Sequence, residues 1–425
     1  MGQDPLHVLW VEPNFPGRLG AVADWLVRRR GYRCSFYCHT ADPRSTWPTS
    51  VGKGLDVQTF GIGGVARDAS VNWSRVLERS LCYAYGCWEV LEKRRPRPID
   101  LIVGRSNGLG STLFAPVYWP AAPVANFVDY YYHAHDHDLA GEAGPETSPA
   151  YFHWRRSMAA IDLLDLEQTA LAWTPTQWQR DLFPSEYREQ FLVLHDGIDT
   201  ERFARSAWHA AAAGPRSIAG RVVADDVRIV TFVARSLDRL RGFDRFLTIA
   251  NELLRTRDDV ICVVVGDPIV RRGLDVEFHN RDYAAHLMAK QPLFDPDRVW
   301  FLGPSTPTLV AEVLAAADLH IAPSRPYPVA RSLLEAMAAG CIVLASDTAP
   351  HREIVEPGRS GLLVSGQDTD ALKSQALAVL ADIALYRSLG DAASVLVHEH
   401  YSQDVCMPRL AERFTALAVA GGQPS

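Results

Sequence analysis

The order of apolar and helical segments along the chain constrains its fold most strongly. Residues 7–12 form a short apolar segment, a turn rich in Pro and Gly follows, and residues 21–30 have helical spacing up to Gly31. Further apolar segments stand at 32–39, 99–103, 124–127, 171–174 and 191–194, with helical stretches between most of them. Strands that alternate with helices form parallel sheets covered on both faces. The first half of the chain therefore predicts a doubly wound α/β domain.

The same alternation starts again in the second half of the chain. Expected strands are 227–233, 260–265, 299–302, 319–322, 342–346 and 361–364, and expected helices are 242–255, 308–317, 332–339 and 370–381. We predict an N-terminal Rossmann-like domain over 1–203, a connection over 204–225, a C-terminal Rossmann-like domain over 226–398, and a C-terminal helix over 399–425 that packs back on the first domain. Ligands of such sheets bind outside the carboxyl ends of the strands, here facing a cleft between the two domains.

Composition excludes several other classes of protein. The 425 residues are 48% hydrophobic and 22% charged, and their formal net charge is -7, so nucleic acid is not an expected partner. The seven cysteines lack paired CxxC spacing, which argues against a disulfide framework and a zinc site. The sequence begins with no secretory signal and holds no apolar run of membrane-spanning length, so we expect a cytoplasmic protein.

Two small basic runs, 28–30 and 93–97, stand at the ends of expected helices. Cations are favourable at a helix C-terminus, so solvated helix ends are the simpler interpretation. The alternative is contact with an anionic membrane or a lipid-linked acceptor, which would place the protein at the inner face of the membrane.

The most specific motif is RSLLEAMAAG at 331–340, followed by CIVLASDTAP and later by REIVEPGRSGLLV. It predicts a helix that begins at the mouth of the cleft, carries Glu335 near its start and stops at Gly340. The N-terminus of a helix offers free amides and partial positive charge, which suit a diphosphate. A carboxylate beside that diphosphate can accept hydrogen bonds from ribose hydroxyls.

This motif resembles the donor-site signature of family 4 of the GT-B glycosyltransferases (glycosyl transferases group 1), of the type found in bacterial cell-surface polysaccharide assembly. The resemblance implies a retaining glycosyltransferase whose donor substrate is a nucleotide-diphosphate sugar, a UDP- or GDP-sugar, with no required cofactor and no metal. It also implies that the N-terminal domain, 1–203, is the acceptor side and that the C-terminal domain, 226–398, binds the nucleotide sugar. The donor-binding residues that it implies are Gly17, Gly20, Arg235, Arg241, Gly266, Gly303, Tyr327, Arg331, Ser332, Leu333 and Glu335.

The chain departs from the family pattern at two of these positions. Arg241 stands where the family usually has Lys, so a planar fork replaces a point charge. Tyr327 stands where the family usually has the first of two Glu residues, close to the donor sugar. The second substitution puts the usual sugar contacts in doubt, whereas the ribose and diphosphate contacts of Glu335, Arg235 and Arg241 remain.

The segment DYYYHAHDHD at 129–138 follows a strand of the first domain. The family often has a His near the reacting centre there, so His133 and then Asp129 are the candidates for holding the acceptor. Arg235 and Arg241 complete the expected catalytic set, because they can neutralise the leaving diphosphate. The His and Asp cluster is also compatible with a metal site or with a solvated surface loop.

The expected function is transfer of a sugar to a glycan or lipid-linked acceptor. A small-molecule acceptor is the alternative within the same enzyme class. A non-catalytic protein that binds nucleotide sugars or glycans is the alternative from another class, motivated by Tyr327. A nucleotide-sugar epimerase shares the fold, but it needs a carboxylate and His set that the sequence does not place.

Overall fold

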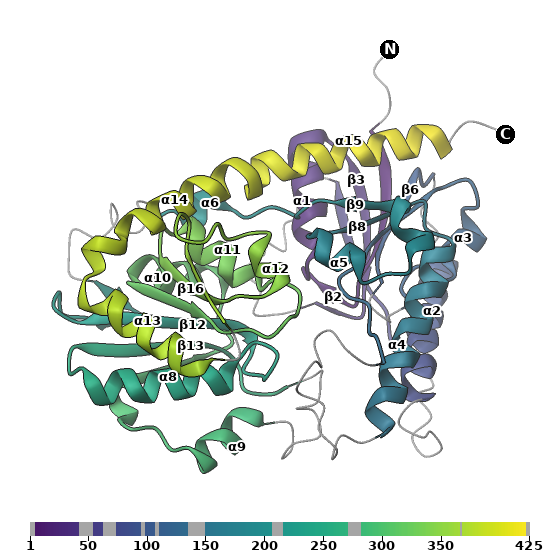
Figure 1. Ribbon diagram of the computed structural model, residues 1–425. Helices are drawn as coiled ribbons and strands as arrows, with labels where there is room; N and C mark the ends of the chain where they lie inside the picture. Colours follow the sequence, from purple (N-terminus) through teal and green to yellow (C-terminus); the bar gives the residue numbers. More distant parts are fainter. Residues whose placement is uncertain are drawn as a thin grey trace. The chain divides into compact units, whose positions relative to one another are not determined.

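A computed structural model describes residues 5–41, 54–62, 74–94, 98–106, 110–134, 149–205, 216–270, 282–365 and 368–421. The chain divides into two compact units (Figure 1). The first unit comprises Met1–Asp196 and Cys406–Ser425, and the second comprises Gly197–Val405. The chain therefore passes from one unit to the other twice.

The first unit is built on a seven-stranded sheet whose neighbouring strands are all parallel. The strand order is β5-β3-β1-β6-β7-β8-β9, so successive strands are added outward from β1, first in one direction and then in the other. The strands are β1 (His7–Val11), β3 (Arg33–Cys38), β5 (Leu55–Thr59), β6 (Leu101–Arg105), β7 (Val124–Phe127), β8 (Leu171–Thr174) and β9 (Phe191–Val193).

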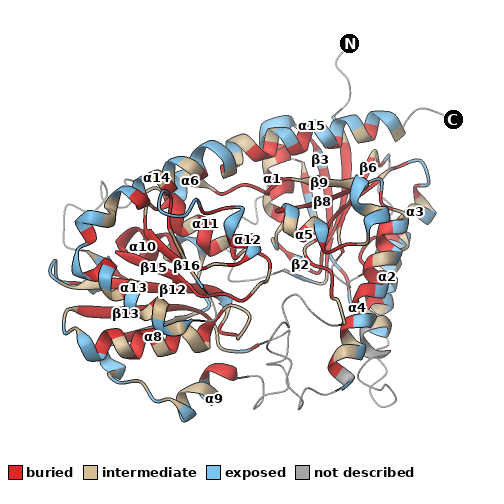
Figure 2. Cartoon of the chain, in the orientation of Figure 1, coloured by how far each residue is buried: buried red, intermediate tan, exposed pale blue. Residues whose placement is uncertain are grey.

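Helices cover both faces of this sheet (Figure 2, coloured by burial). Its central strands β1 and β7 are therefore buried along their whole length. On one face, α1 (Leu19–Arg30) and α15 (Gln403–Gly421) share a core in which Phe414 contacts Trp10 and Trp173. On the other face, α2 (Ser74–Lys93) and α3 (Ala115–Tyr118) pack on a second core. The remaining elements of the unit are β2 (Asn14–Phe15), β4 (Thr40–Ala41), α4 (Pro149–Glu167), α5 (Gln177–Asp181) and η2 (Ser185–Gln190).

The second unit has a six-stranded parallel sheet in the order β14-β13-β12-β15-β16-β17. This is the doubly wound order in which the direction of strand addition reverses between β12 and β15. The strands are β12 (Arg228–Ser236), β13 (Val260–Asp267), β14 (Val299–Gly303), β15 (Leu319–Ala322), β16 (Ile342–Ser346) and β17 (Leu362–Val364).

Two hydrophobic cores enclose the sheet of the second unit. Helices α8 (Phe243–Thr256) and α13 (Thr369–Ala381) pack on one face, and α10 (Pro307–Ala316), α11 (Arg331–Ala338) and α14 (Ile383–Tyr401) pack on the other. The smaller elements are α6 (Thr200–Phe203), β10 (Ser217–Ile218), β11 (Arg221–Val222), α9 (Tyr283–Lys290), η5 (Pro296–Arg298) and α12 (Ala349–Arg352). None of the helices in the described part of the chain combines the length and apolar character that a membrane span requires.

The expected α/β fold is confirmed, and the structure adds elements that the sequence pattern did not indicate. Strand β5 mixes polar and apolar residues because it lies at the sheet edge. Helix α14 was missed because its few buried residues are separated by small and polar residues along its 19 positions, so its apolar periodicity is weak. Residues 206–215 of the predicted connection lie outside the described residues, and the following segment, expected to have no strand, forms the antiparallel pair β10–β11.

Candidate functional site

The predicted donor residues of the second unit gather where the strand order of its sheet reverses. Arg235 lies at the carboxyl end of β12 and is exposed, and Arg241 lies in the loop that leads from β12 to α8. Tyr327 lies in the loop between β15 and α11, and Arg331 begins α11. Because β12 and β15 are neighbours, these two loops border the crevice in which doubly wound sheets bind their ligands.

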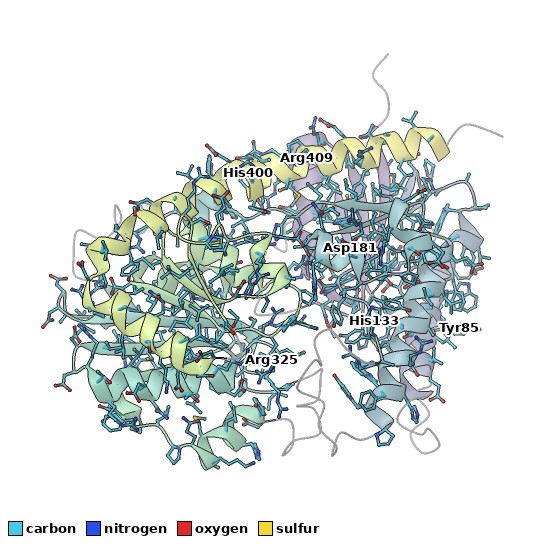
Figure 3. The ribbon with its side chains drawn as sticks, viewed as in Figure 1. Tyr85, His133, Asp181, Arg325, His400 and Arg409 are labelled. Atoms are coloured by element: carbon cyan, nitrogen blue, oxygen red, sulfur yellow. The ribbon has the colours of Figure 1, made fainter. Side chains whose placement is uncertain are left out.

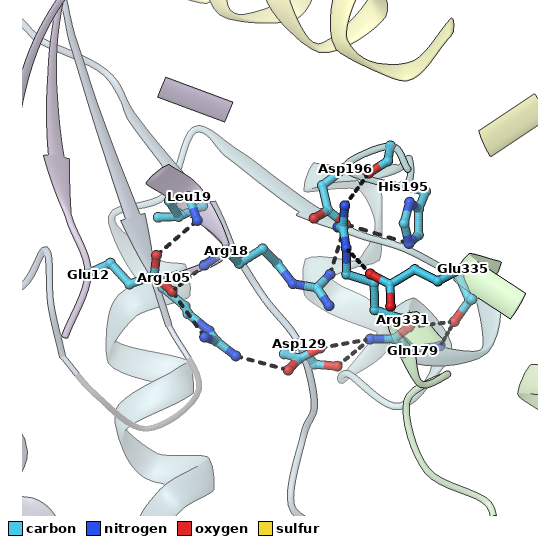
Figure 4. Close-up of polar contacts among 12 residues, drawn as sticks. Glu12, Arg18, Leu19, Arg105, Asp129, Gln179, His195, Asp196, Arg331 and Glu335 are labelled. Atoms are coloured by element: carbon cyan, nitrogen blue, oxygen red, sulfur yellow. Dashed lines mark hydrogen bonds and ion pairs between the residues drawn. The ribbon is translucent and has the colours of Figure 1, made fainter. Parts of the chain in front are cut away.

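Glu335 and Arg331 form an ion pair one turn apart on α11, with Nε of Arg331 3.2 Å from Oε1 of Glu335 (Figure 4). The Glu335 side chain is 14% exposed, so its carboxylate is partly withdrawn from water. Nη2 of Arg331 also donates to the carbonyl oxygen of Gly197 at 2.7 Å. No described side chain caps the N-terminus of α11, which suits an anionic ligand there.

A buried arginine joins the two loops that border the crevice. Arg325 lies in the loop after β15 (Figure 3). It forms a bidentate ion pair with Asp244 through two contacts of 2.8 Å, and it also donates to the carbonyl oxygen of Arg239. Burial would raise the pKa of Asp244, but the hydrogen bonds and charge of Arg325 outweigh it and hold this pKa below its ordinary value. Arg325 was not predicted; its position in SRPYP shortly after a strand is the one local signal that the sequence offers.

Gly242 brings the same two loops into close contact. Its φ is +77°, and a Cβ at this position would lie 2.0 Å from the carbonyl oxygen of Pro323. Only glycine satisfies both conditions, since other residues rarely adopt this φ and their Cβ would overlap the neighbouring backbone. The position of Arg241 beside the loop after β15 is therefore fixed by the backbone.

Four of the predicted donor residues make structural contacts or lie apart from the crevice, and their donor role stays a prediction. The hydroxyl of Ser332 donates to the carbonyl oxygen of Val233 at 2.5 Å, and the side chain of Leu333 is fully buried in the core. Gly266 allows β13 to pass close to the end of β12, because a Cβ there would lie 2.9 Å from the carbonyl oxygen of Ala234. Gly303 ends β14, which is separated from the crevice by β13, so the structure does not bring it together with the others.

The corresponding edge of the first unit carries a buried charge cluster that the sequence analysis only partly identified. Arg105, at the end of β6, forms ion pairs with Glu12 at 3.0 Å and with Asp129 at 3.2 Å (Figure 4). Burial would lower the pKa of Arg105, but these two carboxylates raise it above its ordinary value. Gln179 also donates to the backbone carbonyl of Asp129 at 2.5 Å. Asp129 thus pairs with a cation of the protein itself, the guanidinium of Arg105. Glu12 and Arg105 were missed, although Glu12 ends a predicted strand and Arg105 lies two residues beyond another.

The glycine loop after β1 closes on Glu12. The carboxylate of Glu12 accepts hydrogen bonds from the amides of Arg18 at 3.2 Å and Leu19 at 2.9 Å. Gly17 has a φ of +52°, and a Cβ there would lie 2.3 Å from Oε2 of Glu12; a Cβ on Gly20 would lie 2.9 Å from Cβ of Pro16. Two amides of this loop, between the predicted residues Gly17 and Gly20, are thus engaged by a carboxylate of the protein. The donor role of Gly17 and Gly20 stays a prediction.

His133 lies in the segment after β7 (Figure 3). Its Nε2 is 2.7 Å from the carbonyl oxygen of Leu182, so Nε2 carries a proton, and its ring packs edge-on against Tyr131. Residues 135–138 of the His and Asp cluster lie outside the described residues, and the described part of the chain holds no group of side chains suited to a metal ion. The catalytic roles of His133 and Asp129 stay predictions.

Comparison with known proteins identifies the family. Residues 30–203 match the model of the glycosyl transferase family 4 group, and residues 227–382 match the model of glycosyl transferases group 1. N-acetyl-alpha-D-glucosaminyl L-malate synthase of Bacillus anthracis is 32% identical over 123 residues, 29% of this chain and 32% of that protein. A D-inositol 3-phosphate glycosyltransferase of Geodermatophilus obscurus is 33% identical over 196 residues, 45% of this chain and 40% of that protein. The chain thus spans less than half the length of these relatives.

Solved structures agree on the fold over nearly the whole chain. Sucrose-phosphate synthase of Thermosynechococcus elongatus aligns with a TM-score of 0.73 and 15% identity, covering 98% of this chain and 100% of that one. Alr3699/HepE of Anabaena, in complex with UDP and glucose, aligns with a TM-score of 0.67 and 17% identity, covering 97% and 100%. At such identity the likeness shows the fold, which is GT-B. With both halves matched by models of one family, the chain belongs to the family 4, group 1 glycosyltransferases of the GT-B fold.

Proposed function

We propose that the protein transfers a sugar from a nucleotide-diphosphate sugar to an acceptor, with the donor bound at the carboxyl edge of the second unit's sheet. The observation that carries this proposal is the placement of Arg235, Arg241 and Glu335 around the crevice between β12 and β15. Two guanidinium groups and the N-terminus of α11 can neutralise a diphosphate, and a partly buried carboxylate one turn into α11 can accept from ribose hydroxyls.

The reaction proposed is a transfer with retention of configuration at the anomeric carbon. The bond between that carbon and the diphosphate oxygen breaks, and the acceptor hydroxyl oxygen bonds to the same face of the sugar. The proton of the hydroxyl passes to the departing diphosphate oxygen, so no protein nucleophile is needed. Arg235 and Arg241 stabilise the negative charge that develops on the leaving group.

A UDP-sugar is the first donor to test, because the HepE structure was solved with UDP and glucose; a GDP-sugar is the second. The acceptor that we propose is a glycan or a lipid-linked sugar. Two relatives instead carry names that include L-malate and D-inositol 3-phosphate, which supports a small polar acceptor as the second candidate. His133 and Asp129 are the proposed acceptor-side residues.

Calorimetric titration of the purified protein with UDP and GDP, with and without a chelator, tests the donor site. We expect one of the two nucleotides to bind and the chelator to have no effect. Turnover of the matching sugar nucleotide is then followed with oligosaccharide, lipid-linked and small polyol acceptors, and the anomeric configuration of the product is read by NMR. Inversion would exclude the retaining mechanism.

Two other outcomes would support the competing functions. Nucleotide binding without turnover on any acceptor would indicate a non-catalytic binding protein. Conversion of the sugar nucleotide in the absence of acceptor would indicate an epimerase.

A further inference from the structure

The guanidinium group of Arg241 is held against the aromatic ring of Tyr327. Its central carbon lies 5.1 Å from the centroid of the ring, within the range of a cation–π interaction. Nη1 of Arg241 donates to the carbonyl oxygen of Pro328, the next residue, at 2.6 Å. The ring and the carbonyl belong to one loop, so two independent contacts from that loop fix the orientation of a single guanidinium.

The backbone on both sides of this contact is fixed as well. The amide of Arg325 donates to the carbonyl oxygen of Leu240 at 3.0 Å, and the amide of Arg241 donates to the buried carboxylate of Asp238 at 2.8 Å. Together with the close approach of Gly242 to Pro323, these bonds set the distance between the two loops. The stacking of Arg241 on Tyr327 is therefore a built feature of the crevice.

A stacked guanidinium suits a diphosphate better than a mobile one does. Stacking leaves the edge of the group, with its remaining N–H donors, available to phosphate oxygens in a fixed plane. A group that is already ordered loses less conformational entropy when the ligand binds. A carboxylate at position 327 would instead form an ion pair with Arg241 and compete with the phosphate oxygens for its donors.

We propose that Tyr327 is a positioning residue that holds Arg241 for the donor diphosphate. It acts through Arg241 and not on the sugar. This inference rests on the proposed donor site, and it assigns a role to the residue that replaces the family's first Glu. It follows that loss of the ring weakens UDP and UDP-glucose by the same factor and weakens UMP, which lacks the second phosphate, by less.

Isothermal titration of the full chain with UDP, UDP-glucose and UMP tests the proposal, with GDP and its analogues if the wild type binds GDP instead. Tyr327→Ala should weaken UDP and UDP-glucose about 3- to 30-fold, as expected for a partly exposed cation–π contact. Tyr327→Phe keeps the ring and should stay within about twofold of the wild type. Phe294→Ala, which removes a similar stack 5.2 Å from Arg255 outside the crevice, should change nothing and serves as the matched control.

A double-mutant cycle with Arg241→Ala separates positioning from direct contact. Tyr327→Ala should have no further effect once Arg241 is absent. The same weakening in both backgrounds, or a loss confined to UDP-glucose, would show that the ring touches the donor and would overturn the proposal. If Tyr327→Ala does not fold, Tyr327→Leu replaces it. If the wild type binds neither nucleotide, the donor site itself is refuted. If the wild type and Tyr327→Ala bind UDP equally well, only this inference is refuted.

Discussion

Arg105 donates a hydrogen bond to Glu12 over 3.0 Å, and this ion pair joins the ends of β6 and β1 at the point where the strand order of the first unit reverses. In doubly wound sheets this point is where a ligand is expected. In the first unit, side chains of opposite charge from the protein itself already form ion pairs at this point. The first unit therefore presents a nearly neutralised edge, in contrast to the arginine-bordered crevice of the second unit.

Removal of Arg105 tests how far the first unit depends on this cluster. Arg105→Met would leave the carboxylates of Glu12 and Asp129 without their cation, and breaking a buried ion pair typically costs about 3 to 5 kcal/mol of unfolding free energy. Urea denaturation measures the loss. The control is Arg28→Met, which removes a pair between Arg28, 54% exposed, and Asp24 on α1 and should cost less than about 1 kcal/mol. Equal losses in the two variants would contradict the structural role assigned to Arg105.

Glu335→Ala should weaken nucleotide binding, because the variant loses a charge-assisted hydrogen bond to ribose worth about 1.5 to 3 kcal/mol. The loss should be the same for UDP and for UDP-glucose, since both carry the ribose. Glu252→Ala removes a comparable helical pair with Arg255 on α8, outside the crevice, and should leave affinity unchanged. Unchanged affinity in Glu335→Ala would show that the ribose binds elsewhere.

Gly242→Ala should destabilise the second unit more than Gly220→Ala does. Both glycines have a φ near +77°, so both substitutions add about 1 to 2 kcal/mol of backbone strain. A Cβ on Gly220 meets nothing within 4 Å, whereas a Cβ on Gly242 would lie 2.0 Å from the carbonyl oxygen of Pro323. Chemical denaturation should therefore give an extra loss, of about 2 kcal/mol or more, for Gly242→Ala alone. Equal losses would mean that the loop moves aside freely.

Stability should also depend on pH through a buried carboxyl pair on α4. The side chains of Asp162 and Asp165 are fully buried and contact the hydroxyl of Ser106 at 2.8 and 2.9 Å. Burial and then the charge of Asp162 raise the pKa of Asp165 to about 8. The folded protein therefore keeps this proton at neutral pH, whereas the unfolded chain releases it near its ordinary pKa of about 3.9.

The stabilising contribution of this proton is complete below about pH 4 and is lost as the pH rises to about 8, at about 1.4 kcal/mol per pH unit. Asp165→Asn should remove this slope. Urea unfolding of both proteins between about pH 5 and pH 8 measures the difference. Parallel pH profiles for the wild type and the variant would refute the raised pKa.

The alternation of apolar and helical segments was enough to predict the fold because buried parallel strands have unbroken apolar sequences. β7, β8, β15 and β16 begin and end where the sequence pattern places them, since each is buried on both faces. The edge strand β5 and helix α14 escaped prediction because their burial is partial. Partial burial therefore weakens the local pattern without always hiding it, since the edge strands β9 and β14 were still predicted from their apolar residues.

The candidate site was predicted less completely, because its contacts join residues far apart in sequence. Arg235, Arg241 and Glu335 were found from a motif, but the pairing of Arg325 with Asp244 spans 81 positions and has no local signature. For the same reason the motif could not indicate that the hydroxyl of Ser332, a predicted donor residue, donates to the carbonyl oxygen of Val233 in β12. A charged residue in the sequence does not by itself indicate a ligand site in either unit, because a neighbouring side chain can already neutralise its charge.

Because Phe414 of α15 contacts Trp10, the core of the first unit is complete only after α15 has been synthesised. Residues 197–405 form a continuous stretch that is synthesised before most of α15. The second unit can thus complete its core while the first unit still lacks α15, which covers one face of its sheet. Domains usually acquire structure in order from the N-terminus. Here we expect the earlier-synthesised part of the chain to be the last to become protease-resistant.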